Sequence, residues 1–190
     1  MSTQLEAHNS YGFKSETNRL GLWLFLISDS FVFAGLMVSR FYLFQGERPD
    51  LNQLLGFAVT LILITSSFFM YRAETDIRHG NAKGFTRNIL VTIILGVLFL
   101  LGVVGLEWPT APFSVGENAM ASVFFTMTGM HALHVLSGVI LLSIVYRNGK
   151  KGLYSEQRHF PVEAAAIYWH FVDVVWVFFY PALYLMGIAA

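Results

Sequence analysis

Five long apolar stretches constrain the fold of this chain more than any other feature of its sequence. They run over 20–44, 51–71, 88–106, 119–146 and 163–188. An α-helix needs about 20 apolar residues to cross the hydrocarbon core of a bilayer, and each stretch is about that long. The chain is 55% hydrophobic and only 13% charged, which is too apolar for a soluble domain of 190 residues. We therefore expect an all-α, polytopic membrane protein, a bundle of five transmembrane helices.

The polar segments between these stretches suggest how the chain is divided. They contain turn and helix-breaking residues such as Pro49, Gly80, Pro109 and Gly149. Residues 1–19 are polar and lack the short apolar core of a signal peptide, so we expect the first apolar helix to act as the membrane signal. The sequence predicts a polar cytoplasmic N-terminus over 1–19, followed by one five-helix membrane domain over 20–190.

The distribution of Lys and Arg predicts the orientation. Ten of the 12 basic residues fall in the N-terminal segment and in the second and fourth loops, which lie on one side of the membrane; only Arg40 and Arg48 lie on the other side. Because cationic loops tend to remain in the cytoplasm, this asymmetry predicts an N-in, C-out orientation.

Charge and cysteine content exclude several classes of function. The formal net charge is zero and no basic run is present, so nothing indicates a nucleic-acid partner. The absence of cysteine excludes disulfides, thiolate metal sites, iron–sulfur clusters and c-type haem attachment within this chain. Histidine ligation of a metal or haem remains open.

Ionisable residues inside the apolar stretches are the main candidates for function. Burying each at the membrane centre costs on the order of 2.5 to 3.5 kcal/mol, so such residues rarely face lipid. His131 and His134 are three residues apart, as are His170 and Asp173, so each pair shares a helix face. We expect Asp29 and Asp173 to be the hydrogen-bond partners of His134 and His170, in a structural network between helices. The whole set is Asp29, His131, His134, His170, Asp173 and, near a helix entrance, Glu163.

Two sharper interpretations use the same residues. Paired imidazoles from two helices can hold an iron or copper ion, although His131 and His134 have no matching histidine pair on another helix. A chain of Asp and His can also carry protons. Few polar residues occupy the outer half, so the sequence favours a short inner-side proton antenna over a complete channel.

Four motifs carry a resemblance to a known family. They are LGLWLFLISDSFVF from Leu20, ITSSFFMYRA from Ile64, HALHVLSG from His131 and YWHFVDVVWVFFYPALYLMG from Tyr168. At these residues the chain resembles subunit III of the haem-copper respiratory oxidases, the family of cytochrome c oxidases and related quinol oxidases. The last motif is the most specific, and the match covers nearly the whole membrane part.

The resemblance implies the five-helix bacterial form, located in the inner (plasma) membrane of a bacterium. It implies an accessory subunit of a proton-pumping terminal oxidase that packs on catalytic subunit I, with subunit II also present, and holds phospholipid. Haem and copper would reside on the partner subunits, and this chain would carry no catalytic, cofactor-binding or metal site. Asp29 matches the family's first-helix carboxylate, where longer forms have Glu, and Glu107 matches a family carboxylate near the outer end of the third helix.

Two other functions are considered beside this one. A related accessory subunit of a nitric oxide reductase shares the five-helix pattern by resemblance. An independent transporter would be expected to have helices broken near the middle of the membrane. The only proline within a predicted helix is Pro181, in the outer half of the last helix, and a single proline there is more often a bend than a binding site.

Overall fold

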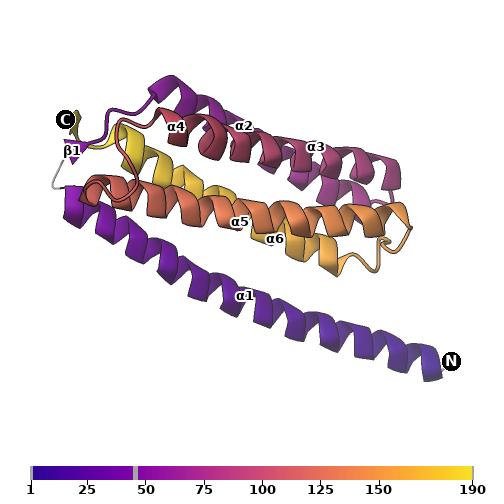
Figure 1. Cartoon of the computed structure of the whole chain (residues 1–190). Coiled ribbons are helices and arrows are strands. Elements are labelled where there is room, and N and C mark those ends of the chain that lie inside the picture. Colours follow the sequence, from indigo (N-terminus) through magenta and orange to yellow (C-terminus); the bar gives the residue numbers. More distant parts are fainter. Residues whose placement is uncertain (1, 45–46, 190) are drawn as a thin grey trace.

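The computed structural model describes residues 2–44 and 47–189, and it is a bundle of long helices (Figure 1). The helices are α1 (Ser2–Phe44), α2 (Gln53–Arg78), α3 (Ala82–Leu100), the π-helix η1 (Leu101–Glu107), α4 (Trp108–Thr110), α5 (Ala119–Lys150), α6 (Phe160–Tyr180) and the π-helix η2 (Pro181–Leu185). Two short strands, β1 (Glu47–Arg48) and β2 (Ile188–Ala189), pair in parallel near the C-terminus.

Among the described residues, five helical segments are long and apolar enough to cross a membrane. They are Glu16–Phe44, Gln53–Arg78, Ala82–Thr110, Ala119–Lys150 and Phe160–Leu185. The predicted five-helix, all-α class is therefore confirmed. The helices differ from the predicted windows at their ends: α2, for example, continues past Tyr71 to Arg78, through the good helix formers Arg72, Ala73 and Glu74. The last helix ends earlier than expected, before Gly187, whose φ is 110°.

Asparagine side chains begin three of the spanning helices. Asn52, Asn81 and Asn118 each accept a hydrogen bond from the backbone N–H three residues later, at 3.0, 3.0 and 2.7 Å. These side chains satisfy N–H groups that have no partner within the helix. The turn between α2 and α3 is further fixed by Asp76, which accepts hydrogen bonds from the side chains of Asn81 and Asn88.

Two tryptophans of α6 fill the centre of the bundle. Trp169 and Trp176 are fully buried, and their indole N–H groups donate to the hydroxyls of Ser66 and Thr60 on α2, at 3.0 Å each. Small residues make room for them: a Cβ atom added at Gly96 would lie 2.6 Å from the Trp169 ring, and one at Gly138 would lie 2.8 Å from it. Glycine at these positions allows close helix packing without a hydrophobic driving force.

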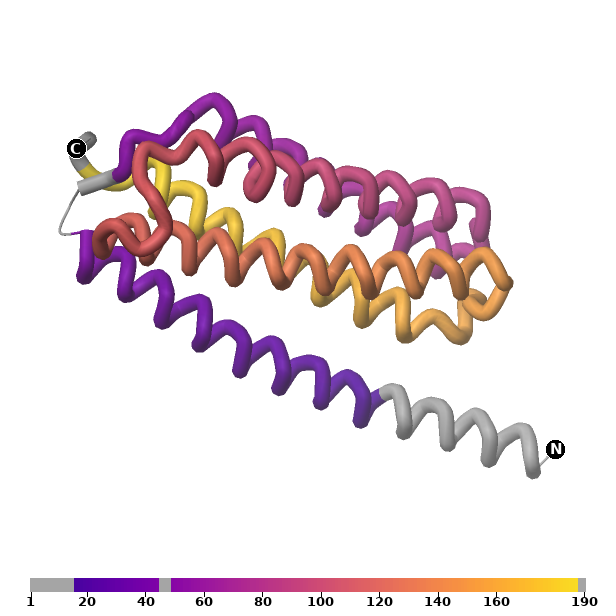
Figure 2. Tube along the Cα trace, viewed as in Figure 1, coloured from indigo at the N-terminus to yellow at the C-terminus, as the bar shows by residue number. Residues whose placement is uncertain are grey.

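Helix α1 lies apart from the other four. It packs on α5 and α6, and Figures 1 and 2 show that it diverges from them toward its N-terminal end. Most of its large apolar side chains are exposed; Leu26, Phe33 and Phe44 are the buried ones. The polar contacts that attach α1 to the bundle therefore matter for its position.

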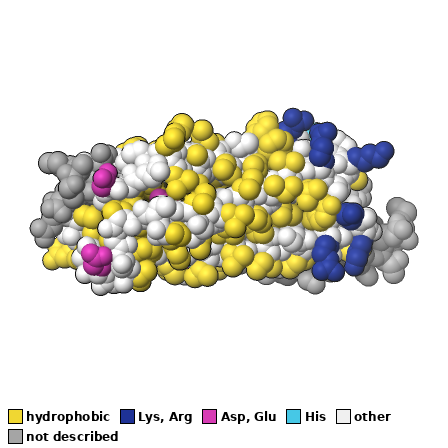
Figure 3. All heavy atoms as spheres, turned by 45° about the horizontal axis from the view of Figure 1, so that its top comes forward, with side chains coloured by type: hydrophobic (Ala, Val, Ile, Leu, Met, Phe, Trp, Pro, Cys, Tyr) yellow, Lys and Arg dark blue, Asp and Glu magenta, His cyan; other side chains and the backbone are white. Residues whose placement is uncertain are grey.

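The surface has the pattern of a membrane protein. Figure 3 shows a broad band of hydrophobic side chains, with Lys and Arg gathered beyond one end of it. That end holds the α2–α3 and α5–α6 turns, whose basic residues include Arg78, Lys83, Arg147 and Lys151. The band matches the apolar region that a bilayer would cover.

Candidate functional site

The side chains of Asp29 and His134 meet between α1 and α5. Nε2 of the imidazole lies 3.0 Å from Oδ2 of the carboxylate, and both side chains are 16% exposed. Nδ1 of the same imidazole lies 2.7 Å from the backbone carbonyl oxygen of Met130. Oδ2 of Asp29 has no aligned hydrogen-bond donor in residues 2–44 and 47–189, so the contact is a close approach of the two groups. The predicted proximity of Asp29 and His134 is present, but the predicted hydrogen bond between them is not among the contacts of the described residues.

Two further polar contacts attach α1 to the bundle at different depths. Near the cationic end, Arg19 forms an ion pair with Glu163 on α6 at 2.8 Å. Near the opposite end, Arg40 donates to the backbone oxygens of Ala182 and Met186, at 2.7 and 2.8 Å. Arg40 is only 2% exposed, and its guanidinium lies over the Phe44 ring. A cation here complements the negative end of the last helix.

The expected pairing of His170 with Asp173 is wrong. Nδ1 of His170 lies 2.6 Å from the hydroxyl of Ser67 on α2. Asp173 is 5% exposed and adjoins Ser67, but neither of its oxygens has a well-aligned hydrogen bond within the described part of the chain. The spacing of three residues places both side chains on one face of α6, and the nearest polar group on the facing helix is then the serine.

His131 does not join His134 in a shared site. It is fully buried, with its ring 4.9 Å from that of Trp176 and 5.5 Å from that of Phe99, measured between centroids. Neither ring nitrogen has a hydrogen-bond partner among the residues that the structure describes. The predicted polar set is thus divided into separate contacts rather than one connected network.

Glu107 occupies a buried position where two π-helices meet. It closes η1, and one of its carboxylate oxygens accepts a hydrogen bond from the hydroxyl of Tyr184 in η2. The carboxylate is 2% exposed. This interaction joins the third and last spanning helices at the ends far from the cationic turns, so the structure gives Glu107 a packing role.

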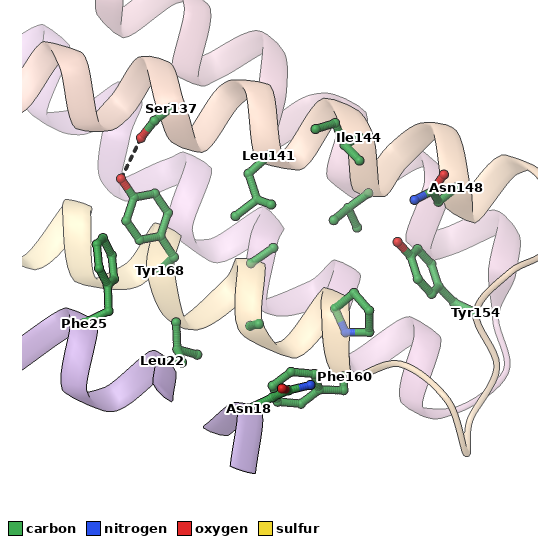
Figure 4. Close-up of a pocket in the computed structure, with 14 residues that line it drawn as sticks. Asn18, Leu22, Phe25, Ser137, Leu141, Ile144, Asn148, Tyr154, Phe160 and Tyr168 are labelled. Atoms are coloured by element: carbon green, nitrogen blue, oxygen red, sulfur yellow. Dashed lines mark hydrogen bonds between the residues drawn. The ribbon is translucent and has the colours of Figure 1, made fainter. Parts of the chain in front are cut away.

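A groove opens where α1 diverges from α5 and α6 (Figure 4). Its volume is about 730 Å³, and apolar side chains such as Leu22, Phe25 and Leu141 line it. Asn18, Asn148 and Tyr154 lie toward the cationic end (Figure 4). The Tyr168 hydroxyl forms a 2.6 Å hydrogen bond with Ser137 at the other end. The groove therefore has an apolar length and a polar mouth.

Within residues 2–44 and 47–189, no three His, Asp or Glu side chains lie together as a metal-ligand set. The imidazole of His134 faces a carboxylate and a carbonyl, that of His170 faces a hydroxyl, and that of His131 faces aromatic rings. Their partners suit hydrogen bonding and packing.

Reasoning from the sequence did not predict two roles, that of Ser67 as the partner of His170 and that of Arg40 as an attachment of α1. Ser67 stands in a Thr-Ser-Ser run inside an apolar stretch, which is a visible signal of a polar contact between helices. Arg40 is a basic residue four positions from the end of an apolar helix. Its partners, the carbonyls of Ala182 and Met186, lie 142 and 146 residues further along the chain, so the sequence gives no sign of the contact.

Comparison with known proteins places these observations in a family. The sequence profile of the family described as "Cytochrome c oxidase subunit III" matches residues 50–188. The chain is 36% identical over 191 residues to cytochrome c oxidase subunit 3 of Synechocystis sp., covering 95% of this chain and 80% of the relative. It is 36% identical to the subunit of the same name from Thermostichus vulcanus, covering 88% and 86%. The corresponding subunit of the mammal Dasypus novemcinctus is 34% identical, covering 89% of this chain and 69% of the relative.

Proposed function

Because the chain belongs to the cytochrome c oxidase subunit III family, we propose that it is an accessory subunit of a proton-pumping haem-copper terminal oxidase in aerobic respiration. The observation that carries the proposal is the similarity, which extends over 95% of this chain in the cyanobacterial relative. Subunits I and II of the oxidase are its partners, and it sits in the plasma membrane of a bacterium with its N-terminus and cationic end in the cytoplasm. The positive end of the hydrophobic band supports that orientation (Figure 3).

In this proposal the chain supports the catalytic subunit and carries neither haem nor copper. The existing partners of the buried imidazoles support it. Metal binding by His134 would require it to give up Asp29 or Met130, and His170 would have to leave Ser67. The redox chemistry would then take place on the partner subunits.

The groove beside α1 is proposed to hold a phospholipid. Its apolar lining, which includes Leu22 of α1 and Leu141 of α5, suits an acyl chain. The amides of Asn18 and Asn148 suit the polar part of a lipid (Figure 4). The mouth lies at the cationic end, where an anionic headgroup would be attracted.

The polar residues of the spanning helices are proposed to assist proton uptake by the complex. Glu163 lies near the cationic turns, and Asp29, His134, His170 and Asp173 lie near the middle of their spanning helices. They form separate contacts, which supports a local proton antenna near the cytoplasmic surface better than a path across the membrane.

The assembly is tested by purifying the complex through a tag on this chain, in mild detergent, from cells grown aerobically. We expect a large partner subunit to co-purify in constant proportion, together with haem bands in the reduced-minus-oxidised spectrum and oxygen-consuming activity. Purification of this chain alone, without a haem-bearing partner, would contradict the proposal.

A further inference from the structure

The contact between Asp29 and His134 depends on a single proton. Nδ1 of His134 lies 2.7 Å from the Met130 carbonyl oxygen, which can only accept, so Nδ1 carries a hydrogen. Nε2 lies 3.0 Å from a carboxylate oxygen. If Nε2 and the carboxylate both lacked a proton, a lone pair would face a negative charge at this distance, and the contact would be repulsive. One further proton, on either group, makes it attractive.

The pair lies between two other attachments of α1 to the bundle. At the outer end, Arg40 holds α1 to the last helix through two hydrogen bonds from a buried guanidinium. At the inner end, the Arg19–Glu163 ion pair joins an arginine side chain that is 51% exposed, and ion pairs of that kind hold weakly. Between them, Phe33 of α1 packs edge-on against the His134 ring, with centroids 4.7 Å apart. The proton-dependent pair therefore lies between a firm attachment and a weak one.

We propose that the Asp29–His134 pair is a proton-dependent latch that sets how far the inner half of α1 stands from α5. When the pair holds its proton, α1 lies against the bundle. When the proton leaves, the inner half swings outward about the Arg40 attachment. Because Leu22 and Phe25 of that half line the groove of Figure 4, the same movement widens the groove.

Few other titratable groups face the pair. Asp29 is the only titratable residue of α1 between Arg19 and Arg40. On α6, Tyr168 lies within electrostatic reach of Asp29, and His170 borders a hollow that Ser30 also lines. On α5, His131 lies within electrostatic reach of His134 but is enclosed by aromatic rings. Tyr168 is thus the main competing group to control for.

The test measures the distance between α1 and α5 as a function of pH. The chain has no cysteine, so spin labels can be attached at L20C and I140C, two exposed positions on these helices. Double electron–electron resonance is recorded on the intact membrane-embedded complex, with signal from partner thiols subtracted using the cysteine-free chain. Raising the pH from mildly acidic to alkaline should increase the ratio of wide to narrow distances about tenfold, the change expected for losing one favourable contact between charged groups.

Two variants assign the change to the latch. In D29N the amide can donate to an unprotonated Nε2 of His134 or accept from a protonated one, so the narrow distance should persist at every pH. Y168F removes the competing hydroxyl and should leave the transition in place. The latch is a property of this chain and does not depend on the proposed oxidase role. A parent distance that stays constant with pH, a D29N profile that follows the parent, or loss of the transition in Y168F would overturn it.

Discussion

At the scale of single residues, the partner of a buried imidazole is chosen by the facing helix. His134 and His170 both lie inside apolar stretches, and the sequence predicted a carboxylate as the partner of each. His134 meets Asp29 of α1, as its residue type suggests, whereas His170 meets Ser67 of α2. Sequence spacing indicates which side chains share a face, but not which polar atom of another helix comes within 3 Å.

The contact of His170 gives the first prediction. S67A removes the hydroxyl and leaves a buried ring nitrogen without its partner, which should cost about 1 to 3 kcal/mol. Thermal unfolding of the purified complex in detergent should show this as a lower melting temperature for the transition of this chain. S39A is the matched control, because the Ser39 hydroxyl only bonds back to Gly35 of its own exposed helix. Equal melting temperatures for the two variants would argue against the contact.

At the scale of helices, the apolar windows predicted the number of elements, while the ends depended on local chemistry. The cap at Asn81 and the polar continuation of α2 moved two boundaries by several residues, whereas α5 begins at Ala119, where the apolar window begins. The π-helices η1 and η2 had no signal in the apolar pattern, because hydrophobicity alone does not distinguish the three helix types. Both π-helices end where Glu107 and Tyr184 meet, which is a tertiary contact.

The last turn of the chain provides an element-scale prediction. R40Q removes the charge that holds the carbonyl oxygens of Ala182 and Met186, and η2 should fray. We expect faster hydrogen–deuterium exchange across 181–187 by about tenfold or more, since hydrogen bonds from charged groups contribute about 1.5 to 3 kcal/mol. R72Q is the control, since Arg72 lies on the exposed side of Phe68 at the other end of the protein. Unchanged exchange in 181–187 would show that Arg40 does not hold this turn.

Close packing of α3 on α6 gives a second prediction at this scale. A methyl group at Gly96 would collide with the Trp169 ring, so G96A should destabilise the bundle by about 1 to 3 kcal/mol. G35A adds the same methyl group where no atom lies within 4 Å, and should be neutral. The yield and melting temperature of the intact complex measure both. A G96A complex as stable as G35A would mean that the tryptophan can move aside at little cost.

At the scale of the whole molecule, the family and the five-helix class could be reached from the sequence, and the relation of α1 to the other helices could not. Asp29, Arg19 and Arg40 are spread over one helix, and their partners come from α5, α6 and η2. Only the folded bundle shows that these three contacts leave a groove between them (Figure 4). Each partner is separated from its arginine or aspartate by more than a hundred residues.

The groove gives a prediction for the assembled protein. L141W should fill the apolar middle of the groove and reduce the phospholipid that co-purifies with the complex, as counted by native mass spectrometry. I94W places the same bulk at an exposed position of α3 outside the groove and should leave the lipid count unchanged. If both variants retain the same lipids as the parent complex, the groove does not hold one.

The central claim is that this chain supports a haem-copper oxidase without carrying its redox centres. The most direct test is to measure haem and copper per catalytic subunit in the intact complex and again after this chain has been stripped away with detergent. We predict that haem and copper contents stay the same while the stripped complex loses activity sooner during turnover. Loss of haem or copper in proportion to the chain removed would contradict the account and assign a redox centre to this subunit.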